Sequence, residues 1–314
     1  MDNDRRSFLS KLILALGGIA AGGSSCRLAL RRPGQSGLGS QSAEAATQTN
    51  LVWITGQDPY ANTVKAVNAL GGMKRFVKKG HRVTILPNIG WARKPEQAAN
   101  TNPQVVRALI EMCHDVGAKS ITIFCNPCND MRVCLDLSGI GKIVEGSAAR
   151  FEYISGDGWR ARSAPTGCTH IKSADVYRAA IECDTLISAP IAKHHGGSTL
   201  TMCCKNLMGA VRDRGYIHQA LHPGIADLAM MIPTSLCVLD ATRILLRNGP
   251  TGGDVKDTQQ MNTVIAGLNP GEVDVLGATL FQMAPSEIKY LKILADRGFM
   301  NLDPSKLGIK RLTA

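Results

Sequence analysis

The sequence predicts an α/β protein with a mainly parallel or mixed sheet and helices on both faces. Segments of strand length recur along the chain and are apolar almost throughout, which is typical of strands buried on both sides. Helical patterns lie between several of these segments, and this alternation indicates a sheet covered by helices. The expected strands are residues 51–55, 82–86, 120–124, 151–155, 185–189, 236–239 and 263–266.

The clearest predicted helix covers residues 103–116. Asn102 stands where a side chain caps a helix N-terminus, and Pro103 suits the first turn because no N–H is needed there. One face of this helix is apolar at helical spacing. It comprises Val105, Val106, Leu109, Ile110 and Cys113.

Composition narrows the class of protein and of partner. The chain has 314 residues, of which 44% are hydrophobic, so it can bury a real core and is not a disordered chain. Its formal charge of +11 suits an anionic ligand or an acidic surface. Aromatic residues make up only 4%, which leaves little for nucleobases to stack on, so nucleic-acid binding is not expected.

Residues 1–45 have the pattern of an export signal. Arg5 and Arg6 precede Phe8 and Leu9, and the apolar run of residues 12–23 is too short for a membrane helix, which needs about 20 residues. A charged start, a short apolar run and the small-residue site at residues 43–45 are typical of a signal peptide, and the arginine pair indicates the twin-arginine kind. We therefore expect the twin-arginine translocation machinery as a partner and the periplasm as the location.

The remaining chain is predicted to hold one α/β domain. Residues 46–50 are expected to be a tether and residues 51–314 the domain, without a transmembrane helix in the mature chain. A stretch rich in Gly, Pro and charges indicates a possible insertion near residues 155–175.

Three cysteines follow the expected strand 120–124. Cys125 and Cys128 have the spacing that lets two thiols face one metal or close a redox disulfide, and Cys134 adds a third soft ligand. A chain that folds before export does so among reduced thiols, which favours a metal over a disulfide. The adjacent Cys203 and Cys204 are interpreted as a sign of tight helix packing, since adjacent cysteines form only a strained ring.

A loop rich in polar residues is expected after strand 185–189. It contains Lys193, His194 and His195, and histidine supplies either a metal ligand or an acid–base group near neutral pH. Adjacent histidines point in different directions on most backbones, so at most one is expected to serve a given centre. A solvated polar loop is the alternative, but loops at strand ends in such folds commonly carry function.

Further polar residues could bind an anion. Lys205 and Asn206 offer a cation and an amide to an anion or a carbonyl group, and Asp240 stands at the end of an expected strand. Lys205 is also a candidate for lowering the pKa of a thiol such as Cys128.

These motifs together resemble the domain-of-unknown-function 362 family. The resemblance covers roughly residues 50–300 and lies in residues 79–88 (KGHRVTILPN), 101–103 (TNP), 193–194 (KH), 205–209 (KNLMG), 226–228 (ADL), 239–240 (LD), 249–253 (GPTGG), 268–270 (LNP) and 273–274 (VD). Cys128, Cys134 and residues 138–140 (SGI) are similar to a Cys-bearing subgroup with twin-arginine signals. The family has no settled activity, and some members join ferredoxin-like iron–sulfur domains. This sequence lacks the closely repeated cysteines of such a domain.

Three hypotheses of function follow. The first is a periplasmic enzyme or redox protein with a metal ion or iron–sulfur cluster, held by Cys125, Cys128, Cys134 and His194 or His195, with His194 and Lys205 as catalytic residues. The second is a periplasmic protein that binds an anion or small molecule through Lys193, Lys205, Asn206 and Asp240, with structural cysteines. The third is an envelope scaffold without a small ligand. Cys128, Cys134, His194 and Lys205 are expected to share one site if the first hypothesis holds.

Overall fold

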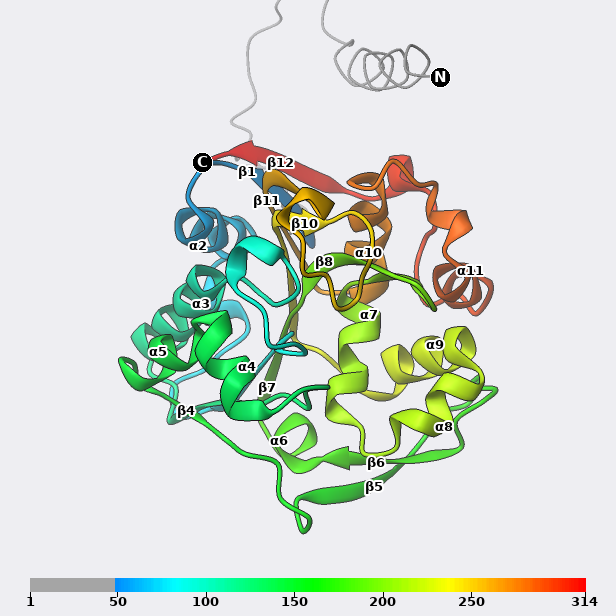
Figure 1. Cartoon of the computed structure of the whole chain (residues 1–314), viewed down its shortest axis with the longest axis horizontal. Coiled ribbons are helices and arrows are strands. Elements are labelled where there is room, and N and C mark those ends of the chain that lie inside the picture. The colour runs from blue at the N-terminus through cyan, green and yellow to red at the C-terminus, as the bar shows by residue number, and fades with distance from the viewer. Residues whose placement is uncertain (1–48) are drawn as a thin grey trace, which may run out of the picture. The chain divides into compact units, whose positions relative to one another are not determined.

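A ten-stranded mixed sheet runs through the part of the chain that the computed structural model describes, residues 49–314 (Figure 1). The strands are β1 (Leu51–Thr55), β2 (Arg82–Pro87), β3 (Ser120–Ile123), β4 (Ala149–Phe151), β7 (Thr185–Ala189), β8 (Ile191–His195), β9 (Thr199–Thr201), β10 (Leu236–Leu245), β11 (Thr258–Gly267) and β12 (Ile309–Thr313). Their order is β12-β1-β11-β10-β7-β2-β3-β4, and β8 pairs with β10 and β9. The neighbours β7, β2, β3 and β4 are parallel, whereas β11 is antiparallel to β1 and β10.

Helices cover both faces of this sheet. They are α2 (Pro59–Ala69), α3 (Pro103–Asp115), α4 (Met131–Ser138), α5 (Ile140–Glu145), α6 (Arg178–Ile181), α7 (Cys203–Asn206), α8 (Arg214–Gln219), α9 (Leu221–Met231), α10 (Pro270–Thr279) and α11 (Lys289–Asp296). In Figure 1, α2, α3, α4 and α5 lie on one side of the sheet, and α7, α9, α10 and α11 lie on the other. The predicted α/β fold class is therefore confirmed, with a mixed sheet.

Alternation along the strands divides the interior into two hydrophobic cores. In β10, Leu236 and Val238 belong to the core under α2 and α3, whereas Cys237 and Leu239 belong to the core under α7, α9 and α10. Successive side chains of a strand point to opposite faces, so a strand covered on both faces must be apolar at every position. This requirement explains the unbroken apolar runs in the sequence.

Several predicted elements match the structure closely. Strands β1 and β7 have the predicted bounds, and α3 starts after Asn102, whose side chain accepts a hydrogen bond from the Gln104 backbone N–H at 2.9 Å. Strand β4 is an exception, because it ends at Phe151, where the predicted strand begins. Strands β10 and β11 include the predicted segments but are longer, with ten residues each.

Besides β4, the segment of residues 193–195 differs from the sequence-based expectation, and the possible insertion near residues 155–175 contains a small sheet of its own. Lys193, His194 and His195 lie in strand β8 rather than in a loop, because their backbone pairs with β9 and, at Lys193, with β10. Near residues 155–175, β5 (Trp159–Ser163) and β6 (Ser173–Tyr177) form a separate two-stranded antiparallel sheet.

The predicted signal peptide and most of the tether lie outside the described residues. Within residues 49–314, no helix combines the length and the apolar character needed to cross a membrane.

A buried carboxylate holds the β5–β6 connection to helices α9 and α11. Asp227 accepts hydrogen bonds from the backbone N–H groups of Thr169, His170 and Ile171 at 3.2, 2.8 and 2.7 Å. Its side chain is fully buried and forms an ion pair with Arg297 at 2.7 Å. Because a buried charge is costly unless it is paired and hydrogen-bonded, this carboxylate fixes three segments at once.

We therefore predict that Asp227→Ala lowers the free energy of unfolding by about 3–5 kcal/mol, since it leaves Arg297 and three backbone donors without their acceptor. Urea denaturation measures this change. The matched control is Lys292→Ala, which removes an exposed ion pair with Asp296 in α11 and is expected to cost about 0.5 kcal/mol or less. Equal losses in the two variants would contradict the assigned role of Asp227.

Candidate functional site

A cavity of about 660 Å³ opens beside the carboxyl ends of β2 and β3, and we call it the basic cavity. Ligands in α/β folds commonly bind at this end of a parallel sheet, and the volume is in the range of small-molecule sites. Segments after β2 and β3, the β8–β9 hairpin and helices α7 and α8 contribute to its wall. Its polar and thiol-bearing lining residues are Asn88, Cys125, Asn126, Cys128, Lys193, His195, Thr201, Lys205, Asn206, Arg212, Asp213, Arg214 and His218.

Lys193 is a fully buried cation at the wall of the basic cavity. Its side chain is only 1% exposed, and its Nζ donates hydrogen bonds to Asn88 Oδ1 at 2.9 Å and to the Ala99 carbonyl at 2.5 Å. An ammonium group has three donors, so one remains. Both acceptors are neutral, and no carboxylate of residues 49–314 forms an ion pair with Lys193.

Asn206 positions this lysine through Asn88. The Asn206 amide donates to the Leu86 carbonyl at 2.9 Å and to Ser188 Oγ at 3.3 Å, and its oxygen accepts from Asn88 Nδ2 at 3.1 Å. Its donors and acceptor are therefore engaged by the protein. Asn206 lines the cavity as predicted, but these bonds give it a positioning role.

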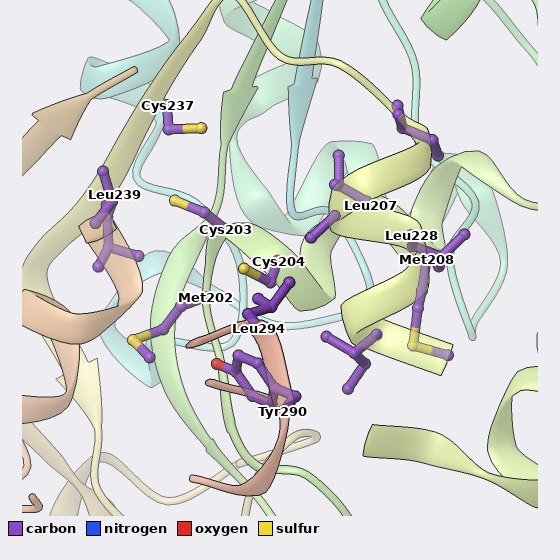
Figure 2. Packing of buried hydrophobic residues seen from close by; sticks show 14 of the residues in the cluster. Met202, Cys203, Cys204, Leu207, Met208, Leu228, Cys237, Leu239, Tyr290 and Leu294 are labelled. Carbon is purple, nitrogen blue, oxygen red and sulfur yellow. The ribbon is translucent and has the colours of Figure 1, made fainter. Parts of the chain in front are cut away.

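Lys205 lies on α7, a one-turn helix whose first backbone N–H groups are bound by the Asp274 carboxylate. Asp274 accepts hydrogen bonds from the backbone N–H groups of Cys203 and Cys204 at 2.6 and 3.0 Å, and from Tyr290 Oη at 3.2 Å. Cys203 and Cys204 are free thiols buried in the hydrophobic core beside Tyr290 (Figure 2), which agrees with the predicted tight packing. The backbone of Lys205 is thus held rigidly, whereas within residues 49–314 its amine has neither a hydrogen bond nor an ion pair.

Arg214 brings a third cation to the basic cavity from the start of α8. Its guanidinium donates to the carbonyl groups of Asn126 and Pro127 at 2.8 and 3.3 Å and lies 3.8 Å from Cys128 Sγ. Asp213 is the one carboxylate of the lining residues, and its Oδ1 already caps α8 by accepting from the Tyr216 N–H. Positive charge therefore dominates the cavity.

The two lysines titrate far below their usual range because of this environment. Burial, followed by the charge of Lys205, lowers the pKa of Lys193 to about 7. Burial also lowers the pKa of Lys205 to about 8, where Cys128 opposes the shift and Arg214 adds to it. Desolvation and a like charge both disfavour the protonated amine, and a bound anion would reverse these effects.

Backbone hydrogen bonds fix the tautomers of two histidines at the cavity. His195 Nδ1 accepts from the Gly197 and Ser198 N–H groups at 3.0 and 3.2 Å, so its proton is on Nε2. Burial, then the charges of Lys205 and Lys193, lower the pKa of His195 to about 3, so the ring is neutral near pH 7. His218 Nδ1 lies 2.7 Å from the Arg214 carbonyl, which can only accept, so in the neutral ring Nε2 is an acceptor.

Thr201 contributes a hydroxyl without a protein partner. The residue is 3% exposed and lines the basic cavity, yet its Oγ1 makes no hydrogen bond within residues 49–314. Buried polar atoms in proteins are nearly always paired, so an unpaired hydroxyl at a cavity wall indicates that a ligand or water completes it.

The three cysteines after β3 do not form a closed metal site. Cys125 is buried, with its thiol against the Ile89 carbonyl and Met131 Sδ, and burial raises its pKa. Cys134 is buried in the core under α3, while Cys128 is exposed at the cavity. Across residues 49–314, no three His, Cys, Asp or Glu side chains are grouped so that they could hold one metal ion. The predicted ligands Cys125, Cys128, Cys134 and His194 or His195 are therefore not grouped as a metal centre within the described residues. The three cysteines still lie near one another, because Cys134 and Cys128 both add to the raised pKa of Cys125 and Cys128 adds to the raised pKa of Cys134.

Two other predicted site residues have structural contacts instead. His194 Nδ1 accepts from the Gly249 N–H at 3.1 Å, and a Cβ at Gly249 would lie only 2.0 Å from the His194 carbonyl oxygen. Asp240 is fully buried and accepts from the Asn102 N–H at 2.7 Å and from Thr242 at 2.7 and 2.9 Å. Neither residue lines the basic cavity.

Of the four residues expected to share one site, Cys128 and Lys205 line the basic cavity, whereas Cys134 and His194 do not. Four other candidates also line it, namely Cys125, Lys193, His195 and Asn206. Sequence reasoning gave no role to Arg214 or Thr201. Arg214 and His218 are four residues apart on α8, and that spacing, which places two side chains on one helix face, was an available signal. For Thr201 the sequence holds no comparable signal.

The fold and the site define an α/β protein with a basic cavity at the carboxyl ends of parallel strands. The chain belongs to the family described as domain of unknown function (DUF362), whose model matches residues 83–279, more than half of the chain.

Among curated proteins, the chain is similar to the thylakoid-associated protein sll1697 of Synechocystis sp. The two are 25% identical over 228 residues, which cover 70% of this chain and 68% of that protein.

Two solved structures are also similar. The lactate racemase apoprotein of Thermoanaerobacterium thermosaccharolyticum aligns with a TM-score of 0.48 and 11% identity over 77% of this chain. A Thermotoga maritima protein aligns with a TM-score of 0.39 and 9% identity over 71% of this chain. The matched region spans 58% of the length of each of these chains.

Proposed function

We propose that the protein binds a small anionic molecule, a carboxylate or a phosphate, in the basic cavity. Lys193, Lys205 and Arg214 would neutralise the charge of the ligand. The Thr201 hydroxyl and the Nε2–H of His195 are neutral donors of residues that line the same cavity, and they would fix the orientation of the ligand.

The observation that carries this proposal is the excess of cations over carboxylates at the cavity, where Lys193 is fully buried and Lys205 and Arg214 are partly buried. Lys193, Lys205 and Arg214 line one cavity, and none of them has an ion pair within residues 49–314. Burying a cation without a counter-charge is expensive, and the lowered pKa of Lys193 reflects that cost. A bound anion would stabilise the charged form. Arg212 fits the same trend less strongly, since it faces Asp175 at 3.7 Å on the surface.

The alternative of a metal ion or iron–sulfur cluster receives no comparable support. No three of its predicted ligands are grouped to hold one metal ion within residues 49–314, and only Cys128 is an exposed thiol among the three cysteines after β3. Cys128 instead lies 3.8 Å from Arg214, where its sulfur is one more group that a bound molecule could contact.

We predict that inorganic phosphate binds the full chain more tightly than chloride at the same ionic strength. A phosphate concentration of 100 times the Kd should raise the free energy of unfolding by about 2.7 kcal/mol, because the ligand binds only the native state. Lys205→Met should weaken phosphate binding about tenfold or more, since it removes a partly desolvated charge. Isothermal titration calorimetry and thermal unfolding in phosphate and chloride measure both effects.

Lys310→Met is the matched control, because Lys310 is an exposed cation on β12 that does not line the cavity. This variant should bind phosphate like the parent protein. Equal losses of phosphate affinity in Lys205→Met and Lys310→Met would mean that only the net charge of the protein matters, which would contradict a specific site. Equal affinities for phosphate and chloride would also refute the proposal.

We also propose that residues 1–45 direct export to the periplasm by the twin-arginine route. The support is the motif itself, Arg5-Arg6 followed by Phe8 and Leu9, ahead of a short apolar run.

Changing Arg5 and Arg6 together to Lys should therefore leave the unprocessed precursor in the cytoplasm. Cell fractionation and the mass of the retained chain measure this outcome. The second arginine pair, Arg31-Arg32, offers the control, and its change to Lys should leave export unchanged. Normal periplasmic accumulation of the first variant would show that another route is used.

A further inference from the structure

We propose that Lys205 is a nucleophile that forms an imine with the carbonyl carbon of a small 2-oxo acid bound in the basic cavity. This inference rests on the proposed function, because the carboxylate of the 2-oxo acid is the anion that the cavity would bind. Lys193 and Arg214 would hold that carboxylate, and the adjacent carbonyl group would face Lys205.

The contacts distinguish Lys205 from the other lysine of the cavity. Lys193 is 1% exposed and its Nζ is held by Asn88 and by the Ala99 carbonyl, which suits a fixed charge. Lys205 is only partly buried, and its amine has no hydrogen bond or ion pair within residues 49–314. An amine that attacks a carbonyl must be free to approach it, while its backbone must be rigid to aim it. The Asp274 contacts of α7 supply that rigidity.

The environment also supports the unprotonated amine that this chemistry needs. Burial and the Arg214 guanidinium bring the pKa of Lys205 to about 8, so a substantial fraction is neutral at that pH. Desolvation and a neighbouring cation are the two general means by which proteins activate a lysine as a nucleophile.

Two imidazoles that line the cavity, those of His195 and His218, suit imine formation. The bond between Lys205 Nζ and the carbonyl carbon forms, the carbon–oxygen double bond breaks, and the oxygen leaves as water with the two amine protons. His195 is neutral with its proton on Nε2 and can donate a hydrogen bond to the carbonyl oxygen. His218 Nε2 can accept a proton from the amine and pass it to the leaving oxygen. No oxidant or reductant is consumed in this step.

Trapping with sodium borohydride tests the inference. The full chain is incubated with pyruvate, borohydride is added to donate hydride to the imine carbon, and intact and peptide masses are measured. We expect one carboxyethyl group per chain, on the peptide that contains Lys205, and slower trapping when inorganic phosphate is present. Lys205→Arg should lose this adduct, and Lys310→Arg should keep it.

The outcomes separate the inference from the proposed function. Phosphate binding without any adduct at Lys205 would overturn the inference and leave anion binding intact. Labelling at Lys193, or at exposed lysines in the same yield as at Lys205, would overturn it as well. Failure of both phosphate binding and trapping would overturn both. Thermal unfolding of Lys205→Arg checks that a lost adduct does not reflect a lost fold.

Discussion

The ammonium group of Lys193 is the feature around which the basic cavity is organised. It lies inside the protein with only neutral acceptors, Asn88 Oδ1 and the Ala99 carbonyl, and its pKa is lowered to about 7 from the usual 10.5. Between these two pH values the unfolded chain binds a proton at Lys193 that the native chain does not. The burial of Lys193 therefore costs stability below about pH 7, and this cost fades as the pH rises toward 10.5. A bound anion is the natural means of offsetting it.

The surrounding structure serves to hold this charge in place. Asn88 follows β2, Lys193 lies on β8, and Asn206 ends α7, yet their side chains form one hydrogen-bonded series that reaches the Leu86 carbonyl of the sheet. Asp274 anchors the other end of α7 from α10. Its pKa is raised to about 6 by burial, although the backbone donors of α7 oppose that shift. A carboxylate buried in the core thus fixes the helix that carries Lys205 at the cavity.

Local patterns predicted what depends on local rules. Unbroken apolar runs gave β1 and β7, and Asn102 marked the start of α3, because burial on both faces and capping are encoded in neighbouring residues. Lys193, His195 and Lys205 were found as candidates because polar residues next to buried strands are conspicuous. The sequence could not separate Cys128 from Cys134, since the tertiary fold decides that Cys134 on α4 enters the core while Cys128, in the segment before α4, stays exposed. Nor could the sequence show that the Asp240 carboxylate already accepts hydrogen bonds from Asn102 and Thr242, because the tertiary fold sets these contacts. Strand β8 was not predicted because its polar residues Lys193, His194 and His195 are typical of a loop. Its strand conformation depends on pairing with β9, which the sequence does not show.

The pKa of Lys193, measured by NMR titration of its side-chain resonances in labelled full-length protein, tests the central claim most directly. The Lys193→Arg variant assigns the resonance, and the titration is run in chloride and in phosphate at equal ionic strength. If Lys193 is a buried cation at an anion site, its side chain should titrate near pH 7 in chloride and at a clearly higher pH in phosphate. A value near 10.5 in chloride, or the same value in both salts, would contradict the account.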